Sequence, residues 1–229
     1  MLTADSLQFL YDLSQNNNRD WFEKNKTRYE KTLKKPFEQT VAAIIEGLKT
    51  FEPKLAQLEA KKCIFRLHRD VRFSKDKSPY KTHVSAFFAP RQGKTSDDIA
   101  YPGYYMQLSS GHLQIGGGAY NLDKPALHRM RSAIAQDPDS FHELVEAPGF
   151  VSKYEGIQGE KNKVLPPEFK ELVKTEPYLA FKQFYFMADL DPELAIGENF
   201  PKFVLDYFHE AKPLNDYFRA VLFGGYSPV

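Results

Sequence analysis

The sequence predicts an α+β protein with an antiparallel sheet of about four to six strands and helices packed mainly on one face. Two patterns carry this prediction: apolar residues recur at helical spacing near both ends of the chain, and they alternate with period two in between. The 229 residues are 42% hydrophobic and 14% aromatic, which is enough to fill the core of one large domain. We therefore predict a single domain over residues 1–229, with N-terminal helices at 5–50, a sheet at about 63–118 and a mixed, mostly helical part at 124–222.

Two helices are predicted in the N-terminal part. A short one covers about residues 5–13 and ends before the turn signal Asn16–Asn18. A long amphipathic one then runs to Leu48, with its apolar residues spaced mostly by 3, 4 and 7. Pro36 lies inside it and has no N–H to donate to the carbonyl of Thr32, so we expect a kink or a split there.

The pattern then changes to period two. In residues 63–73 the odd positions are apolar except Arg69, and the even positions carry a polar row. That row is Arg66, His68, Asp70 and Arg72. We predict a strand here and further strands at 83–88, 104–109 and 112–116, the last two joined by the hairpin turn Ser110-Gly111.

Helices return after the sheet. At three places an aspartate precedes a proline by one or two positions, a pair that suits the cap and first turn of a helix. These aspartates are Asp123, Asp137 and Asp191. We predict helices at about 124–136, 138–146, 167–174, 192–195 and 200–221, and one more strand at 182–188.

Much of the positive charge lies in one segment. Residues 61–94 hold ten Lys and Arg against two acids, Asp70 and Asp76, a net charge of +8, whereas the other 21 bases and 28 acids net −7. A chain with so uneven a distribution either neutralises the segment within its own fold or presents a cationic surface to an anion.

The first hypothesis for this segment is an anion-binding groove on the sheet. Alternate residues of a strand lie about 6.5–7 Å apart, so two guanidinium groups with His68 between them can grip one phosphate or carboxylate. The turn 74–81 adds lysines, and Asp76 can order it by accepting backbone N–H groups while Pro79 fixes its exit. The expected partner is a small anionic ligand, such as a phosphorylated metabolite, or a nucleic-acid phosphate backbone. The candidate binding residues are Arg66, Arg69, Arg72, Lys77 and Lys81.

Two alternatives stay open. In an enzyme acting on an anionic substrate, Asp70 or His68 would serve as general base or acid while neighbouring cations stabilise developing negative charge. In an internal salt-bridge network without a ligand, Asp70 would pair with Arg66 or Arg72, and the acidic helices would cover the polar row.

Arg69 and a run of glycines need separate explanations. Arg69 stands on the otherwise apolar face, so we expect it either to turn outward at a bulge or to lie against a carboxylate such as Glu23 or Asp189. The run Gly116–Gly118 either forms an anion-binding loop before a helix or lets a neighbouring segment approach closely.

No metal site and no cofactor are predicted. His68, Asp70, His83 and His112 lie on predicted strands that could bring them together, but their spacing matches no metal motif. One cysteine, Cys63, cannot form an internal disulfide or a thiolate cage. No apolar run approaches the roughly 20 residues of a membrane span, and the N-terminus lacks the pattern of a signal peptide. We expect a soluble, cytoplasmic protein without a membrane partner.

Two motifs resemble those of a known family. The first is Asn17-Asn18-Arg19-Asp20-Trp21-Phe22, followed by Lys26, Tyr29 and Pro36. The second is Arg66-x-x-Arg69-Asp70-x-Arg72-Phe73-x-x-Asp76-Lys77-x-Pro79-Tyr80-Lys81. Over nearly its whole length, Gly116–Gly118 included, the chain resembles the conserved hypothetical proteins of bacteria and fungi grouped as domain of unknown function family 2461. The resemblance implies a single α+β domain of about this length, and it supplies no activity, cofactor or catalytic residue.

Overall fold

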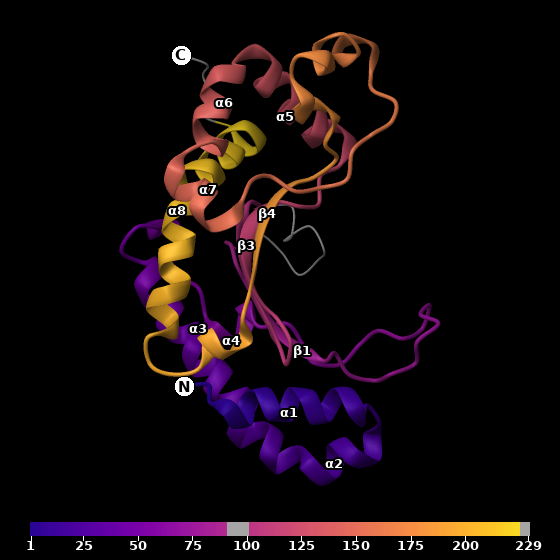
Figure 1. Cartoon of the computed structure of the whole chain (residues 1–229), viewed down its shortest axis with the longest axis vertical. Helices are drawn as coiled ribbons and strands as arrows, with labels where there is room; N and C mark the ends of the chain where they lie inside the picture. Colours follow the sequence, from indigo (N-terminus) through magenta and orange to yellow (C-terminus); the bar gives the residue numbers. More distant parts are fainter. Residues whose placement is uncertain (91–100, 225–229) are drawn as a thin grey trace. The chain divides into compact units, whose positions relative to one another are not determined.

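The computed structural model describes residues 1–90 and 101–224. Within them, an antiparallel sheet has four strands in the order β1-β2-β3-β4, and helices account for much of the rest (Figure 1). The predicted α+β class is therefore confirmed. The strands are β1 (His83–Phe88), β2 (Gly103–Ser109), β3 (Leu113–Ala119) and β4 (Phe184–Leu190).

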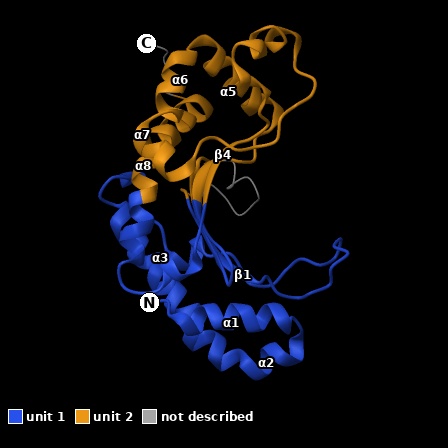
Figure 2. Ribbon diagram, in the orientation of Figure 1, with its two compact units in different colours: residues 1–88, 105–115, 189–206 blue, residues 89–104, 116–188, 207–229 orange. Residues whose placement is uncertain are grey.

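The chain divides into two compact units that interleave along the sequence (Figure 2). Strands β2, β3 and β4 and the long helix α8 (Phe200–Phe223) each contribute residues to both units. The single domain over residues 1–229 stays a prediction. Unit 1 comprises residues 1–88, 105–115 and 189–206, and unit 2 comprises residues 89–104, 116–188 and 207–229.

Unit 1 begins with the predicted N-terminal helices, and its core is built on them. The apolar stripe of the third helix is buried and contacts β1. The elements are α1 (Ala4–Gln15), α2 (Arg19–Arg28), the π-helical turn η1 (Tyr29–Lys34), α3 (Lys35–Leu48), the 3₁₀ turn η2 (Pro53–Leu55) and α4 (Ala60–Cys63).

The expected interruption at Pro36 is confirmed. The π-helical turn ends two residues before the proline, which occupies the first turn of α3. The carbonyl of Thr32, to which Pro36 cannot donate, accepts a hydrogen bond of 2.5 Å from the buried hydroxyl of Ser6. A side chain from α1 thus satisfies the backbone group that the proline leaves open.

The part of the sheet in unit 1 has one apolar and one polar face. In β2, Met106 and Leu108 are fully buried, whereas Tyr105 and Gln107 are partly exposed. This alternation is what a sheet covered by helices on one side requires. It leaves a half-exposed polar face available in unit 1.

Unit 2 has a core rich in aromatic side chains. Tyr104 stacks on Phe208 at 4.7 Å between ring centroids, and Phe186 meets Phe150 and Tyr154 at 5.3 and 4.7 Å. Its helices, besides its share of α8, are α5 (Lys124–Gln136), α6 (Pro138–Val145) and α7 (Pro148–Tyr154). The predicted caps are present, since Asp123 accepts from the N–H of Ala126 and Asp137 from that of Ser140.

Two predicted helical segments need correction, and an α-helix of unit 2 was not predicted. The segment 167–174 forms two 3₁₀ turns, η4 (Pro167–Phe169) and η5 (Leu172–Lys174), and residues 192–195 form the 3₁₀ turn η7 (Pro192–Ala195). Each lies in a short segment, where one cap and one turn do not offset the cost of helix nucleation. Helix α7 was not predicted, because no aspartate caps its start. A further 3₁₀ turn is η6 (Pro177–Ala180).

The predicted strand at 63–73 is wrong. Cys63 ends α4, and the residues that follow make only isolated antiparallel bridges, Ile64 with Ala86 and His68 with Tyr80. Period-two alternation marks an extended chain, but a strand also needs a continuous neighbour, and Pro79 in the returning segment cannot donate to one. The fourth strand is instead β4, predicted at 182–188.

The glycine run lies inside β3, so its interpretation as an anion-binding loop is wrong. A Cβ atom on Gly116 would overlap the carbonyl oxygen of Phe186, and one on Gly117 that of Gly103. The glycines therefore allow the close approach of neighbouring backbone. Of the helices described, none has the length and apolar character needed to span a bilayer.

Candidate functional site

The predicted basic residues lie on a segment of unit 1 that leaves α4 and returns to β1. We call residues 64–82 the basic arm (Figure 1). Its two halves are joined by backbone hydrogen bonds: Lys81 N–H donates to Leu67 at 2.8 Å and Arg69 N–H to Pro79 at 2.9 Å. The arm is therefore a braced antiparallel loop, although it is not a strand of the sheet.

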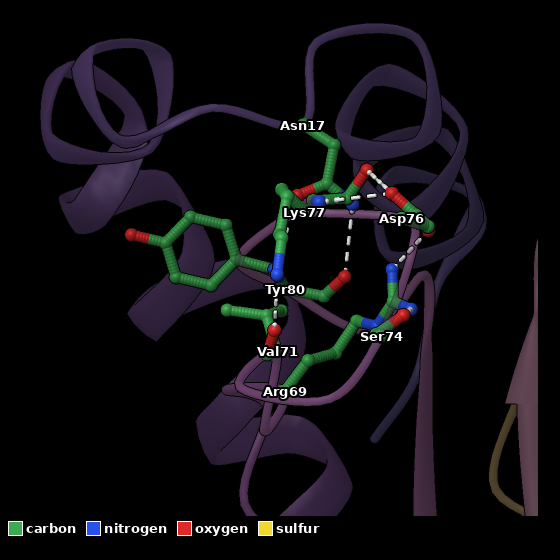
Figure 3. Close-up of polar contacts among 8 residues, drawn as sticks. Asn17, Arg69, Val71, Ser74, Asp76, Lys77 and Tyr80 are labelled. Carbon is green, nitrogen blue, oxygen red and sulfur yellow. Dashed lines mark hydrogen bonds and ion pairs between the residues drawn. The ribbon is translucent and has the colours of Figure 1, made fainter.

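Asp76 orders the turn of the basic arm, as predicted. Its Oδ1 accepts hydrogen bonds from the N–H and the hydroxyl of Ser78 at 2.9 and 2.6 Å, which makes an Asx turn (Figure 3). Its Oδ2 pairs with the guanidinium of Arg69, whose Nη2 also lies 3.4 Å from the Ser74 hydroxyl. The hydrogen bonds from Ser78, together with Arg69, hold the pKa of Asp76 well below its ordinary value.

The partner of Arg69 differs from both carboxylates that were expected. It is Asp76, seven residues further along, and neither Glu23 nor Asp189. Asp189 instead lies 3.0 Å from the ring of His112. The expectation failed because it assumed a regular strand at 63–73, whereas the turn brings Asp76 back beside Arg69.

Two further contacts fix the arm. Lys77 Nζ donates to the carbonyl of Val71 at 3.0 Å, so this lysine braces the turn. Asn17 locks the base: its Nδ2 donates to the carbonyl of Tyr80 at 2.9 Å and its Oδ1 accepts from the Tyr80 N–H at 3.1 Å (Figure 3). The buried Tyr80 ring stacks on Phe22 at 4.2 Å. Asn17 was not among the predicted site residues. The one feature of the sequence that could have indicated its role was its place in the N-terminal motif.

Arg72 and Asp70 form an ion pair that is exposed to solvent. Arg72 contacts Asp70 through Nε at 3.0 Å and Nη2 at 2.7 Å, a bidentate pair. These bonds lower the pKa of Asp70 to about 2. The salt-bridge alternative predicted this pairing, and the pair is present. The alternative also expected acidic helices to cover the polar row, but the Arg72 side chain is 76% exposed and that of Asp70 is 42% exposed. His68 is also exposed, with its ring edge-on to Tyr80.

Besides the exposed Lys75 on the turn, these contacts leave over two cations at the base of the arm, Arg66 and Lys81. Within residues 1–90 and 101–224, neither has a carboxylate at ion-pair distance. The half-buried Lys81 has its Nζ 5.2 Å from the centroid of the Phe65 ring, and burial together with the charge of Arg66 lowers its pKa. Burial and the charge of Lys81 likewise lower the pKa of His83. Positive charge thus gathers at the base of the arm, with no opposing acid among the residues that the structure describes.

A polar network on the sheet lies next to this base. Phe65 N–H donates to the carbonyl of Ser85, whose hydroxyl shares a hydrogen bond with Tyr105. Tyr105 donates to Gln107 at 2.8 Å, and Gln107 donates to Gln114 at 3.0 Å. The side chains come from β1, β2 and β3, and none of them was among the predicted binding residues. The alternation of polar with apolar residues in β2 is the feature of the sequence that could have indicated this polar face.

The four residues considered as metal ligands are not brought together. Across the part of the chain that the structure describes, no group of three or more His, Cys, Asp or Glu side chains could hold a metal ion. Arg91 and Lys94, which contribute to the charge of segment 61–94, lie outside the described residues.

Fold and arm together define an α+β protein that presents a braced, basic loop beside a polar sheet face. The chain matches the family described as "Conserved hypothetical protein (DUF2461)" over residues 5–217, and it belongs to that family. No curated protein and no solved structure gives a significant match.

Proposed function

We propose that this protein binds phosphate-bearing anions at the base of the basic arm, through Arg66, Lys81 and His83. One observation carries the proposal: Arg66 lies close enough to Lys81 for its charge to lower the pKa of that lysine, and neither has a carboxylate partner among the described residues. Like charges held together repel, and an anion between them would relieve the repulsion. A guanidinium can contact two phosphate oxygens at once, while an ammonium supplies a point charge.

The five predicted binding residues take different parts in this proposal. Arg69 and Lys77 brace the turn, and Arg72 is engaged with Asp70. Arg66 and Lys81 are left to contact the anion. The internal salt-bridge alternative fits Arg69 and Arg72 well, but it gives no reason for two cations at the base that have no carboxylate partner within the described part of the chain.

The enzyme alternative gains no support from the surroundings of Asp70. A carboxyl group with a pKa of about 2 is ionised at neutral pH and is a weak proton acceptor there. Cys63 is buried and is the one cysteine of the sequence, so the chain cannot form an internal disulfide; this fits a reducing compartment, and we extend the proposal to action in the cytoplasm.

Calorimetric titration with sodium tripolyphosphate tests the proposal. The double variant Arg66→Ala/Lys81→Ala should bind at least about tenfold more weakly, because a hydrogen bond to a charged group contributes about 1.5–3 kcal/mol. Both side chains are partly or fully exposed, so the melting temperature should stay within a few degrees.

The matched control is Asp70→Asn/Arg72→Gln, which removes a neighbouring ion pair and leaves the net charge unchanged. It should change the affinity less than about twofold. Equal losses in the two double variants, or no binding by the unmodified protein, would contradict the proposal.

A further inference from the structure

The turn of the basic arm carries an aromatic ring in full contact with solvent. Phe73 is 95% exposed, the most exposed large apolar side chain in the described part of the chain. The guanidinium of Arg72 lies 5.8 Å from its ring centroid, and the side chains of Lys75 and Lys77 nearby are exposed. Single exposed apolar side chains are common on protein surfaces, but this ring is almost completely exposed and lies beside a guanidinium, an arrangement suited to stacking on a ligand.

The backbone that presents this ring is fixed from several directions. The Asx turn at Asp76, the pair of Arg69 with Asp76 and the bond from Lys77 to Val71 close the turn around residues 71–78. Asn17 anchors the base of the same arm. A preorganised turn loses little conformational entropy when its exposed ring meets a partner.

We propose that the basic arm binds single-stranded nucleic acid, with Phe73 stacking on a base and Arg66, Lys75 and Lys81 contacting backbone phosphates. This inference rests on the proposed function and names the class of anion. Aromatic rings combined with cations that follow the backbone are the usual means of binding single strands without sequence preference.

The length of the arm favours a polymer over a small phosphate. Residues 64–69 are held extended by the bridges to Ala86 and Tyr80 and span roughly 16 Å, and Phe73 lies beyond them. A ligand that contacts both the base cations and Phe73 must therefore be long and flexible. Single strands also leave their bases free to stack, whereas a duplex does not.

The composition of the turn favours a base over a lipid surface. Phe73 is flanked by Arg72, Ser74 and Lys75, so one ring is all that the turn can insert. Stacking on a base needs only one ring, and an adjacent guanidinium strengthens it. Stable binding to a bilayer needs a larger apolar surface.

Fluorescence anisotropy with a labelled oligothymidine of about 12 nucleotides tests the inference. Phe73→Leu should weaken binding about five- to tenfold, because leucine keeps apolar surface but cannot stack. Binding of tripolyphosphate should be unchanged. Tyr120→Leu, which removes a half-exposed ring in unit 2, away from the arm in the sequence, is the control and should leave both affinities unchanged.

A second variant gives a direct signal. Phe73→Trp should bind the oligonucleotide at least as tightly as the unmodified protein. Its added emission, measured over that of the single native tryptophan Trp21, should be quenched when a base stacks on it.

Three results would overturn the inference. The first is equal oligonucleotide affinity for Phe73→Leu and the unmodified protein. The second is absence of quenching in Phe73→Trp. The third is that Phe73→Leu loses binding to phosphatidylserine vesicles but not to the oligonucleotide. In each case tripolyphosphate binding that depends on Arg66 and Lys81 would leave the proposed function standing. Loss of that binding would refute the proposed function separately.

Discussion

Two clusters of charged side chains in this protein are built on opposite principles. In unit 2, His142 lies between two acids, 2.8 Å from Glu146 and 2.8 Å from the nearly buried Glu176. In unit 1, the base of the basic arm holds Arg66 and Lys81 without an acid among the described residues. The first cluster is complete within the chain and acts as a brace. In the described residues the second cluster has no opposite charge, as a binding site for an anion requires.

Glu176→Ala should have the largest effect on stability. It removes a carboxylate partner of His142. It also removes the acceptor of the hydrogen bond that the Tyr178 N–H donates to Glu176 at 3.0 Å. We expect the free energy of unfolding to fall by about 2–3 kcal/mol in urea titrations, with tripolyphosphate binding unchanged. Glu171→Ala, which breaks an exposed pair with Lys174, should cost less than about 0.5 kcal/mol. Equal losses in both variants would contradict the distinction between brace and surface pair.

Asn17→Ala should affect both stability and binding. Two hydrogen bonds to the backbone of Tyr80 are lost, which should lower the free energy of unfolding by about 1–2 kcal/mol. The loosened arm should also bind tripolyphosphate more weakly, in contrast to Glu176→Ala. Asn18→Ala is a useful comparison, because the hydrogen bond that it removes caps α2 and does not anchor the arm. An unchanged affinity in Asn17→Ala would show that the anchoring of the arm is irrelevant to binding.

The cluster around His142 should give a pH-dependent stability. Hydrogen bonds to Glu146 and then Glu176 raise the pKa of His142 above its ordinary value of 6.5. Its contribution to stability is therefore complete below pH 6.5 and is lost as the pH rises through the raised pKa. Because about a third of the side chain is exposed, we expect less than about 1 kcal/mol. The difference in unfolding free energy between the unmodified protein and His142→Gln should shrink as the pH rises above 6.5, and a constant difference would contradict the assignment.

The affinity of the base of the arm for anions should depend on pH. The pKa of His83 lies below 6.5 in the free protein because of burial and Lys81, and a bound anion would raise it. Binding then takes up a proton, so the affinity should increase two- to threefold or so as the pH falls below about 6.5. Titrations of His83→Gln should lack this increase. The same increase in that variant would place the titrating group elsewhere.

Local features of this fold were predictable, and contacts between distant segments were not. The Asx turn at Asp76, the caps at Asp123 and Asp137 and the break at Pro36 each depend on neighbouring residues. The bonds from Ser6 to Thr32 and from Asn17 to Tyr80 join residues 26 and 63 positions apart, and no local pattern indicates them.

The arm shows the same limit within the candidate site. Alternation at 63–73 correctly indicated an extended segment with a polar row, but it could not show that this row is exposed or that the segment forms isolated bridges in place of a strand. Nor could composition divide the basic residues into paired and unpaired ones. That division depends on the turn that brings Asp76 to Arg69 and leaves Arg66 and Lys81 without an acid among the described residues.

A crystal structure grown or soaked with tripolyphosphate tests the central claim most directly. The account predicts an anion at the base of the arm, with oxygen atoms about 2.7–3.0 Å from the Arg66 guanidinium and from Lys81 Nζ. The pairs Arg69–Asp76 and Arg72–Asp70 should remain intact beside it. An anion bound at Arg69 or Arg72 with those pairs broken, or no anion on the arm at all, would contradict it.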